Sequence, residues 1–201
     1  MTNQTLYNEI CHHLIYDDKP SEFLNNIYGN PSFSSYPFDM IKNTAKTNQS
    51  PIYHAEGNVW NHTMMVVDEA AKVKEKSKNQ LVFMWSALLH DIGKPQTTRI
   101  KKGKITSYNH DKVGAVLSKE FLSNFTQDEI FINDVSQLVK YHMQILFVIK
   151  GLSYSNIKGM KQDTDIEEIA LLGLCDRLGR AGSNESQEIK NIKTFLNICK
   201  K

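Results

Sequence analysis

The 201-residue chain has few cysteines and no long apolar run. Its three cysteines, Cys11, Cys175 and Cys199, are scattered and lack a CxxC spacing, so we expect reduced thiols and no disulfide framework. The longest apolar runs fall far short of the roughly 20 residues that span a membrane. The first residues contain no basic stretch followed by an apolar one, so no signal peptide is predicted. We therefore expect a cytoplasmic protein with no membrane partner.

The chain also lacks a strong excess of either charge. Its 24 basic and 22 acidic residues give a net charge of +2, without the overall basic character of most nucleic-acid binders. This balance and the absence of a DNA-binding motif argue against a pure nucleic-acid-binding module, but they leave a nucleotide substrate open. The length predicts one domain. We expect residues 1–50 to form an N-terminal helical covering segment and residues 51–201 a single globular unit; the oligomeric state stays open.

Apolar residues recur mainly at helical spacing, which predicts a mostly α-helical fold. The exception lies at 96–108, where Lys102-Gly103 separates two short β-like segments and predicts a small hairpin. The run 145–149 is compatible with a strand or a buried turn. The expected helices are 5–17, 21–27 with Ser21 as N-cap, 38–46, a long helix ending near Lys76, a central helix from 81, 110 to 121 or 122, one capped by Asp128 and ending at Tyr141-His142, 165–178 and 183–199.

The central helix carries the most informative stretch, LVFMWSALLHDIGK at 81–94. It is apolar on most sides, which indicates a buried helix. His90-Asp91 follows directly, and a charged group withdrawn from water needs a partner or a cation. Gly93 suits a left-handed helix cap, and Pro95 is expected to prevent the helix from continuing. The pair therefore lies at the edge of the core, where it could bind a metal.

Further histidines and carboxylates occur near the ends of other expected helices. Imidazole with carboxylate suits Fe, Mn, Co, Ni or Zn, and it excludes a thiolate-type structural zinc site. Each residue also has a structural explanation: a histidine at a helix end can interact with the helix dipole, and Asp176 can pair with Arg177 or Arg180. A shared metal centre explains all of them together. The candidate ligands are His62, His90, Asp91, His110, His142 and Asp176.

Four segments, HAEGNVWNHT, LLHDIGKPQTT, YNHDKVGA and CDRLGR, resemble the HD-domain metal-dependent phosphohydrolase superfamily. They are most similar to the HD domain of bacterial CCA-adding tRNA nucleotidyltransferases and its stand-alone relatives. The resemblance covers about residues 51–180 and implies an all-α helical bundle with at most a small β-hairpin near the site. It also implies one or two divalent metal ions, with Mn, Ni, Co, Fe, Zn and Mg as candidates.

The resemblance further implies how the ligands divide. His62, His90, Asp91 and Asp176 would hold the first metal. Asp91 would bridge to a second metal, whose other ligands would be His110 and His142. Some binuclear members have a His-His pair where this chain has Tyr141-His142, so the second site is expected to be weaker or incomplete.

The resemblance implies a metal-dependent phosphohydrolase, a phosphatase or phosphodiesterase that uses metal-activated hydroxide. Its expected substrate is a phosphomonoester or phosphodiester of a small-molecule nucleotide or an RNA end. Two alternatives remain: an HD-type diiron oxygenase and a non-catalytic nucleotide-binding sensor. Trp60 is expected in the core, with base stacking as its alternative. The predicted catalytic residues are Asp91, Lys94, His54 and Glu56, and the predicted substrate-binding residues are Lys94, Arg177, Arg180 and Tyr108.

Overall fold

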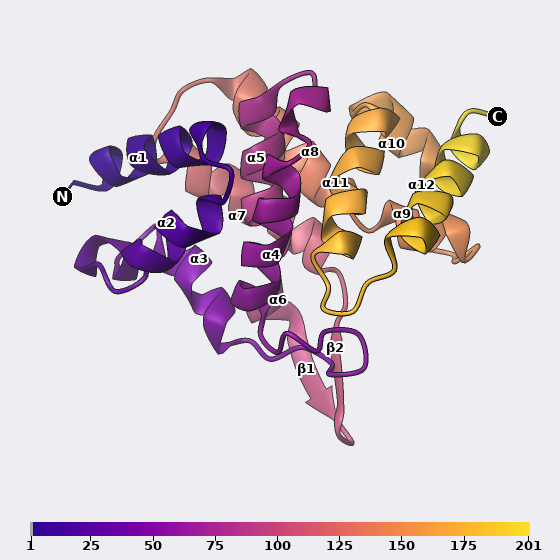
Figure 1. The fold of residues 1–201 in the computed structure, drawn as a ribbon, viewed down its shortest axis with the longest axis horizontal. Helices are drawn as coiled ribbons and strands as arrows, with labels where there is room; N and C mark the ends of the chain where they lie inside the picture. Colours follow the sequence, from indigo (N-terminus) through magenta and orange to yellow (C-terminus); the bar gives the residue numbers. More distant parts are fainter. Residues whose placement is uncertain (1) are drawn as a thin grey trace.

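The computed structural model describes residues 2–201 and is almost entirely helical, with one small hairpin (Figure 1). The predicted all-α fold is confirmed. Among the described residues, no helix is both long and apolar enough to cross a membrane. The elements are α1 (Asn3–Tyr16), α2 (Pro20–Ile27), η1 (Pro31–Ser34), α3 (Asp39–Lys42), η2 (Asn43–Lys46), α4 (Val59–Ala71), η3 (Lys74–Lys76), α5 (Gln80–Leu89), α6 (Lys94–Thr97), β1 (Thr98–Lys101), β2 (Lys104–Ser107), α7 (His110–Ser123), α8 (Glu129–Tyr141), α9 (Gln144–Ile149), α10 (Ile157–Asp163), α11 (Ile166–Leu178) and α12 (Glu185–Cys199).

Helix α5 runs through the centre of the molecule and packs against α1, α4, α8 and α11 (Figure 1). Every residue from 82 to 89 is buried, as the apolar sequence of this helix predicts. The side chains of Phe83, Met84 and Trp85 are completely shielded from solvent. Asn79 caps the start of the helix by accepting a hydrogen bond from the backbone N–H of Val82. A stiff, buried helix thus fixes the position of His90-Asp91.

The turn after α5 differs from its prediction. Gly93 is right-handed, with φ −78°, and therefore is not a left-handed cap. It is needed for space: a Cβ there would lie 2.2 Å from the carbonyl oxygen of His110 and 2.6 Å from the backbone nitrogen of Gly114. Pro95 lies in the first turn of a new short helix, α6, where proline is well tolerated. The missing Cβ lets the His90-Asp91 turn lie directly against the start of α7.

Several other local predictions also need correction. Ser21 is not the N-cap of α2, because Pro20 already begins that helix and Ser21 instead donates its hydroxyl to Asp68. The long helix predicted to reach Lys76 ends at Ala71 and is followed by the short η3. The expected 38–46 helix is divided into α3 and η2, the 145–149 run belongs to helix α9, and α10 was not anticipated. The hairpin is confirmed, with Lys101 paired to Lys104 beside its turn.

The N-terminal helices share the core of the rest of the molecule. Tyr7 of α1 stacks on Trp85 of α5, with ring centroids 5.1 Å apart, and on Phe125, 4.6 Å away. Leu24 of α2 and Phe33 of η1 are buried in the same apolar cluster. Trp60 also packs there, 5% exposed, and donates its indole N–H to Asn25, so its predicted core role is confirmed. All three cysteines are free, as expected.

Candidate metal centre

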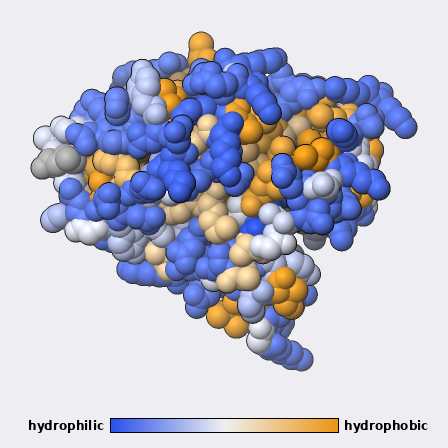
Figure 2. All heavy atoms as spheres, viewed as in Figure 1, coloured by the Kyte–Doolittle hydropathy of each residue, from blue (hydrophilic) through white to orange (hydrophobic). Residues whose placement is uncertain are grey.

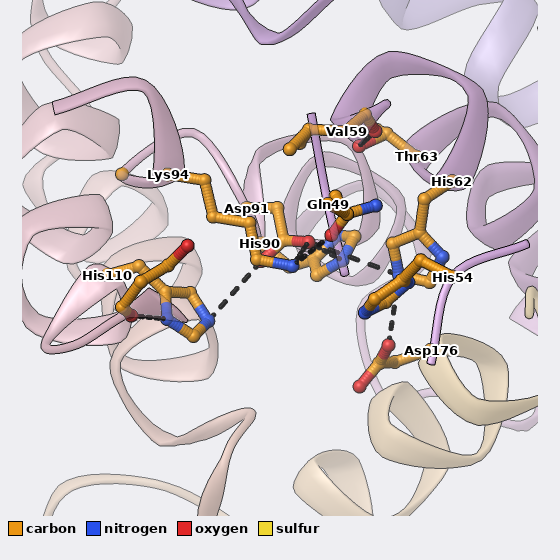
Figure 3. A network of polar contacts seen from close by, with 12 residues as sticks. Gln49, His54, Val59, His62, Thr63, His90, Asp91, Lys94, His110 and Asp176 are labelled. Atoms are coloured by element: carbon orange, nitrogen blue, oxygen red, sulfur yellow. Dashed lines mark hydrogen bonds and ion pairs between the residues drawn. The ribbon is translucent and has the colours of Figure 1, made fainter. Parts of the chain in front are cut away.

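The six candidate ligands, predicted from five different helices, converge on one buried cluster. Figure 3 labels all of them except His142. His62 comes from the first turns of α4, and Asp176 from the last turn of α11. His90 caps the C-terminus of α5, His110 begins α7 and His142 caps the C-terminus of α8. Each of these residues is less than 10% exposed. The fold therefore brings imidazoles and carboxylates together where water has little access.

Asp91 lies at the centre of this cluster and faces a different group with each carboxylate oxygen. Its Oδ2 lies 3.2 Å from Nε2 of His90 and 4.0 Å from Nε2 of His62. Its Oδ1 lies 3.4 Å from Nε2 of His110 and 3.8 Å from Nε2 of His142. These atoms form two groups of potential ligands that share the Asp91 carboxylate: His62, His90 and Asp91, and Asp91, His110 and His142.

Three of the four histidines have their ring orientation fixed in the same way. Nδ1 of His90 lies 2.8 Å from the backbone carbonyl oxygen of Ala87. Nδ1 of His110 lies 2.7 Å from that of Ser107, and Nδ1 of His142 lies 2.7 Å from that of Val139. A carbonyl oxygen only accepts hydrogen bonds, so each Nδ1 carries the ring proton. In the neutral ring, Nε2 then has a free lone pair, and all three lone pairs face Asp91. Ligand histidines are commonly oriented by such a contact.

The contact between His110 and His142 is informative because neither Nε2 has a proton to donate. These two nitrogens are 3.2 Å apart. Burial lowers the pKa of His110 to about 4, since the opposing effect of Asp91 is offset by Lys94 and His142. Burial, together with the neighbouring His90 ring, also lowers the pKa of His142. Two neutral rings with lone pairs converging at this distance require a cation or a proton between them.

His62 differs, because carboxylates lie on both sides of its ring. Its Nε2 lies 3.1 Å from Oδ1 of Asp176, and its Nδ1 lies 3.0 Å from Oε1 of Glu56. Burial alone lowers the pKa of His62, but the hydrogen bonds to Asp176 and Glu56 outweigh burial and raise it. Without a metal the ring thus favours a proton. Glu56 can retain the Nδ1 proton while a cation replaces the proton on Nε2.

The two central carboxylates stay ionised despite their burial. Burial alone raises the pKa of Asp91, but Lys94 and His90 outweigh burial and hold the pKa of that carboxyl well below its usual range. At Asp176, burial is likewise outweighed, here by the charge of Arg180 and by a hydrogen bond from His62, so its pKa is also held low. Both side chains therefore offer full negative charges to a cation.

Lys94 supplies positive charge inside the cluster. Its ammonium lies 2.6 Å from Oδ2 of Asp91 and donates to Oε1 of Gln49, also at 2.6 Å (Figure 3). Lys94 was predicted as a catalytic and substrate-binding residue. Gln49 was not predicted, because it lies in a segment rich in Ser, Pro and Asn that carries no recognisable motif. Gln49 could have been found only through the bridge between Asn48 and Asn58, which folds this segment back against the start of α4.

Glu56 joins three parts of the chain around the site. Its Oε1 lies 2.8 Å from Nδ1 of His54 as well as near His62, and its Oε2 accepts a hydrogen bond of 3.2 Å from the backbone N–H of Ala181. Burial alone raises the pKa of Glu56, but the hydrogen bond from His62 and its other hydrogen bonds lower it to about 2. Burial, assisted by the charges of Lys94 and His62, lowers the pKa of His54 to about 4.

The remaining predicted residues lie at different distances from the cluster. Arg180 joins it through two contacts with Asp176, of 3.1 and 3.0 Å. Arg177 instead pairs with Glu188 of α12 at 2.8 Å. Tyr108 is 69% exposed beside the hairpin, and no described contact links it to the ligand group.

The residues fit a divalent metal centre. Within residues 2–201, Nε2 of His90 and Oδ1 of Asp91 are buried and make no hydrogen bond, while Oδ2 of Asp91 has the ammonium of Lys94 at 2.6 Å. Buried polar atoms without partners are rare, because leaving one unpaired costs about 1–3 kcal/mol. Oxygen and imidazole nitrogen atoms are ligands for Mn, Fe, Co, Ni and Zn. A bound cation would satisfy the atoms that the protein leaves unpaired.

Comparisons with known proteins agree with this geometry. Residues 59–180 match the family model described as HD domain. An A-adding tRNA nucleotidyltransferase from Deinococcus radiodurans is 35% identical over 65 residues, which are 31% of this chain and 15% of that protein. A multifunctional CCA protein from Actinobacillus pleuropneumoniae is 31% identical over 91 residues, 45% of this chain and 21% of the relative. One from Mannheimia succiniciproducens is 25% identical over 142 residues, 67% of this chain and 33% of the relative.

The chain thus spans at most a third of the length of these relatives. The family match, in contrast, extends over more than half of this chain and includes all six candidate ligands. The matched segment begins with the helix that carries His62 and ends just after the helix that carries Asp176. Sequence, fold and the placement of these side chains agree, and the chain belongs to the HD domain family.

Proposed function

We propose that this protein is a metal-dependent phosphohydrolase that cleaves a phosphomonoester or phosphodiester of a nucleotide or an RNA terminus. The observation that carries the proposal is the convergence of three fixed histidine lone pairs on the buried carboxylate of Asp91. The first metal would be held by His62, His90, Asp91 and Asp176. The second would be held by Asp91, His110 and His142.

Divalent cations at these positions would supply Lewis acidity and lower the pKa of water to near neutral. The protein's own groups then bind and orient the substrate. Lys94, already held by Asp91 and Gln49, is positioned to donate to a phosphate oxygen. Arg180 neutralises Asp176 and is 30% exposed at its side chain, so it can also approach an anionic substrate from the rim.

His54 and Glu56 act on the opposite side of His62 in this proposal. Glu56 supports the His62 ring through its carboxylate, whose Oε1 lies 3.0 Å from Nδ1 of that ring. His54 shares the same Glu56 oxygen, so its Nδ1 also carries a proton and its Nε2 is free to accept one. We assign His54 the task of orienting a water molecule or a substrate hydroxyl at the edge of the site.

The substrate class is supported by the names of the relatives. One is an A-adding tRNA nucleotidyltransferase and the others are CCA proteins. We therefore propose a phosphoester of a nucleotide or an RNA end as substrate. Tyr141 differs from the second histidine of some binuclear members, and its hydroxyl donates to Asp163 at 2.7 Å, away from Asp91. The second metal would thus have His142 alone from this helix end.

A substrate panel with an Asp91→Asn variant tests the proposal. The panel contains 2′,3′-cyclic nucleotides, 2′- and 3′-nucleoside monophosphates and an RNA with a terminal phosphate, each with Mn, Ni, Co, Zn, Mg or Fe. Asp91→Asn should reduce turnover of any accepted substrate by at least about a thousandfold, because it removes the carboxylate shared by both metals. The matched control, Asp163→Asn, removes an ion pair with Lys140 outside the centre and should retain turnover. Full turnover by Asp91→Asn would refute the mechanism.

A further inference from the structure

We infer that the β1–β2 hairpin binds the phosphate backbone of single-stranded RNA, so that the preferred substrate is an RNA end and not a free nucleotide. The identity of the reacting group rests on the proposed function; the RNA-binding surface does not. The surface consists of Arg99, Lys101, Lys102 and Lys104, which we call the basic hairpin.

The basic hairpin concentrates the positive charge of the molecule. Residues 92–110 contain five basic side chains, those of Lys94 and the basic hairpin, and no Asp or Glu. Since the whole chain carries +2, the rest of it carries −3. The near-neutral total thus conceals a local cationic surface on an otherwise slightly acidic protein. Such local clustering attracts phosphates even when the overall charge is small.

The hairpin geometry turns these charges toward one side. Side chains alternate between the two faces of a strand, so Arg99 and Lys101 of β1 share a face. In the antiparallel register Lys101 lies directly opposite Lys104, and Arg99 opposite Thr106, which places Lys104 on that same face. Like charges directly opposite each other destabilise a hairpin. All four basic residues are exposed, and within residues 2–201 no carboxylate forms an ion pair with any of them.

The uncompensated repulsion at the hairpin is relieved when an anion binds. The projecting lower end of the molecule in Figure 1 is the hairpin; in Figure 2 its tip is hydrophilic, and hydrophobic side chains lie just above the tip. A small anion would suffice for one lysine, but three cations on the two strands and a fourth in the turn between them fit a linear polyanion. A free nucleotide would place its phosphate at the metal centre and leave the basic hairpin without a partner.

The hairpin is also joined directly to the candidate metal centre. Lys94 begins α6, which leads without a gap into β1, and β2 is followed after two residues by His110. The backbone carbonyl of Ser107, the last residue of β2, accepts the contact that fixes the His110 ring. Tyr108 lies between them, 69% exposed and with no ring stacked on it among the described residues. A charged strip beside an exposed aromatic ring is typical of single-stranded nucleic-acid binding.

Fluorescence anisotropy with a 5′-labelled 12-nucleotide RNA tests the inference. The RNA ends in a 3′-hydroxyl, so it lacks the terminal phosphoester and binding is measured without turnover. The test variant combines Arg99→Gln, Lys101→Gln, Lys102→Asn and Lys104→Gln. Asparagine is used at 102 because Lys102 has φ +50°, which asparagine tolerates. The matched control combines Lys158→Gln, Lys190→Gln and Lys193→Gln, which are exposed on α10 and α12.

Wild-type protein should bind this RNA with a salt-dependent Kd. The hairpin variant should bind at least about tenfold more weakly at 0.1 M salt, and its log–log salt slope should be smaller by about 2–3, since each lost phosphate contact removes roughly 0.7. The lysine control should stay within about twofold of wild type. No RNA binding by wild type, or equal loss in both variants, would overturn the inference.

Anionic phospholipid vesicles test whether the basic hairpin binds a membrane surface instead of RNA. Hairpin-dependent binding to phosphatidylserine vesicles without hairpin-dependent RNA binding would also overturn the inference. The outcome is separable from the proposed function, because RNA binding needs no hydrolysis. Hydrolysis without hairpin-dependent RNA binding would refute only this inference, whereas hairpin-dependent binding without hydrolysis of any substrate would refute only the proposed function.

Discussion

Asp91 is the residue on which the candidate site depends. One carboxylate faces two histidines with Oδ2 and two others with Oδ1, and it also contacts the ammonium of Lys94. The burial of this acid at a candidate metal site could be predicted from the sequence, because HDIGK follows an apolar helix. The hydrogen bonds that fix the surrounding rings could not be predicted from the sequence. Each is accepted by a backbone carbonyl three residues earlier in the chain, and every residue type has such a carbonyl.

Glu56 provides the first prediction at this scale. Glu56→Gln keeps the size of the side chain but removes the charge that supports the Nδ1 proton of His62. Loss of such a supporting group typically weakens metal binding 10–100-fold, and we expect a loss in that range. Competition with a fluorescent chelator measures the affinity without relying on turnover.

The matched control for Glu56→Gln is Glu188→Gln. Glu188 is also partly buried and ion-paired, but its partner is Arg177, which has no described contact with the candidate ligands. Its substitution should change metal affinity by less than about twofold. Unchanged affinity in Glu56→Gln would show that Glu56 does not position His62.

At the scale of the elements, helical periodicity identified most helices, and the Lys102-Gly103 turn between two short β-like segments identified the hairpin. Caps were predictable where one side chain decides them: Asp128 accepts the backbone N–H of Phe131 at the start of α8, as expected. The predicted conformation of Gly93 was wrong, because tertiary contacts determine the turn in which it lies. Gly93 is required by the approach of α7 and not by a left-handed turn, and no pattern within residues 81–95 contains that information.

Gly93→Ala tests how closely the α5–α6 turn must approach α7. The added Cβ would meet two backbone atoms that cannot move aside independently, at 2.2 and 2.6 Å. Overpacking of this kind costs about 1–3 kcal/mol or more, so we expect a loss of unfolding free energy of at least about 2 kcal/mol. Urea denaturation of the metal-free protein measures it.

Gly29→Ala serves as the control for this stability measurement. A Cβ at Gly29 would meet no heavy atom within 4 Å, so its substitution should change the unfolding free energy by less than about 1 kcal/mol. Equal stability of the two variants would indicate that the turn and α7 are not in close contact.

For the whole molecule, we propose that residues 1–50 cover the unit formed by 51–201 and fold together with it. Tyr7 packs between Trp85 and Phe125, and Gln49 reaches into the cluster to accept from Lys94. The family match begins only at residue 59, so this covering segment lies outside it. The sequence indicated helices here but could not show which face of α5 they would cover, because that depends on long-range packing.

Charge is the second property that appears only at this scale. The composition argued against a pure nucleic-acid binder, and the near-neutral total supports that view. The three-dimensional fold instead places the cationic segment of the chain in a projecting hairpin next to the ligands. The average charge and the local charge therefore give different expectations about nucleic-acid binding, and our proposal of an RNA substrate rests on the local charge.

The most direct test of the account is the metal content of protein purified without chelators, measured per chain by elemental analysis. The account predicts one to two equivalents of a divalent transition metal in wild type, depending on how far the weaker second site is filled, and a large loss in Asp91→Asn, because Asp91 belongs to both ligand groups. Asp163→Asn should retain the wild-type content. Protein that binds no metal even after reconstitution, or an Asp91→Asn variant with undiminished content, would contradict it.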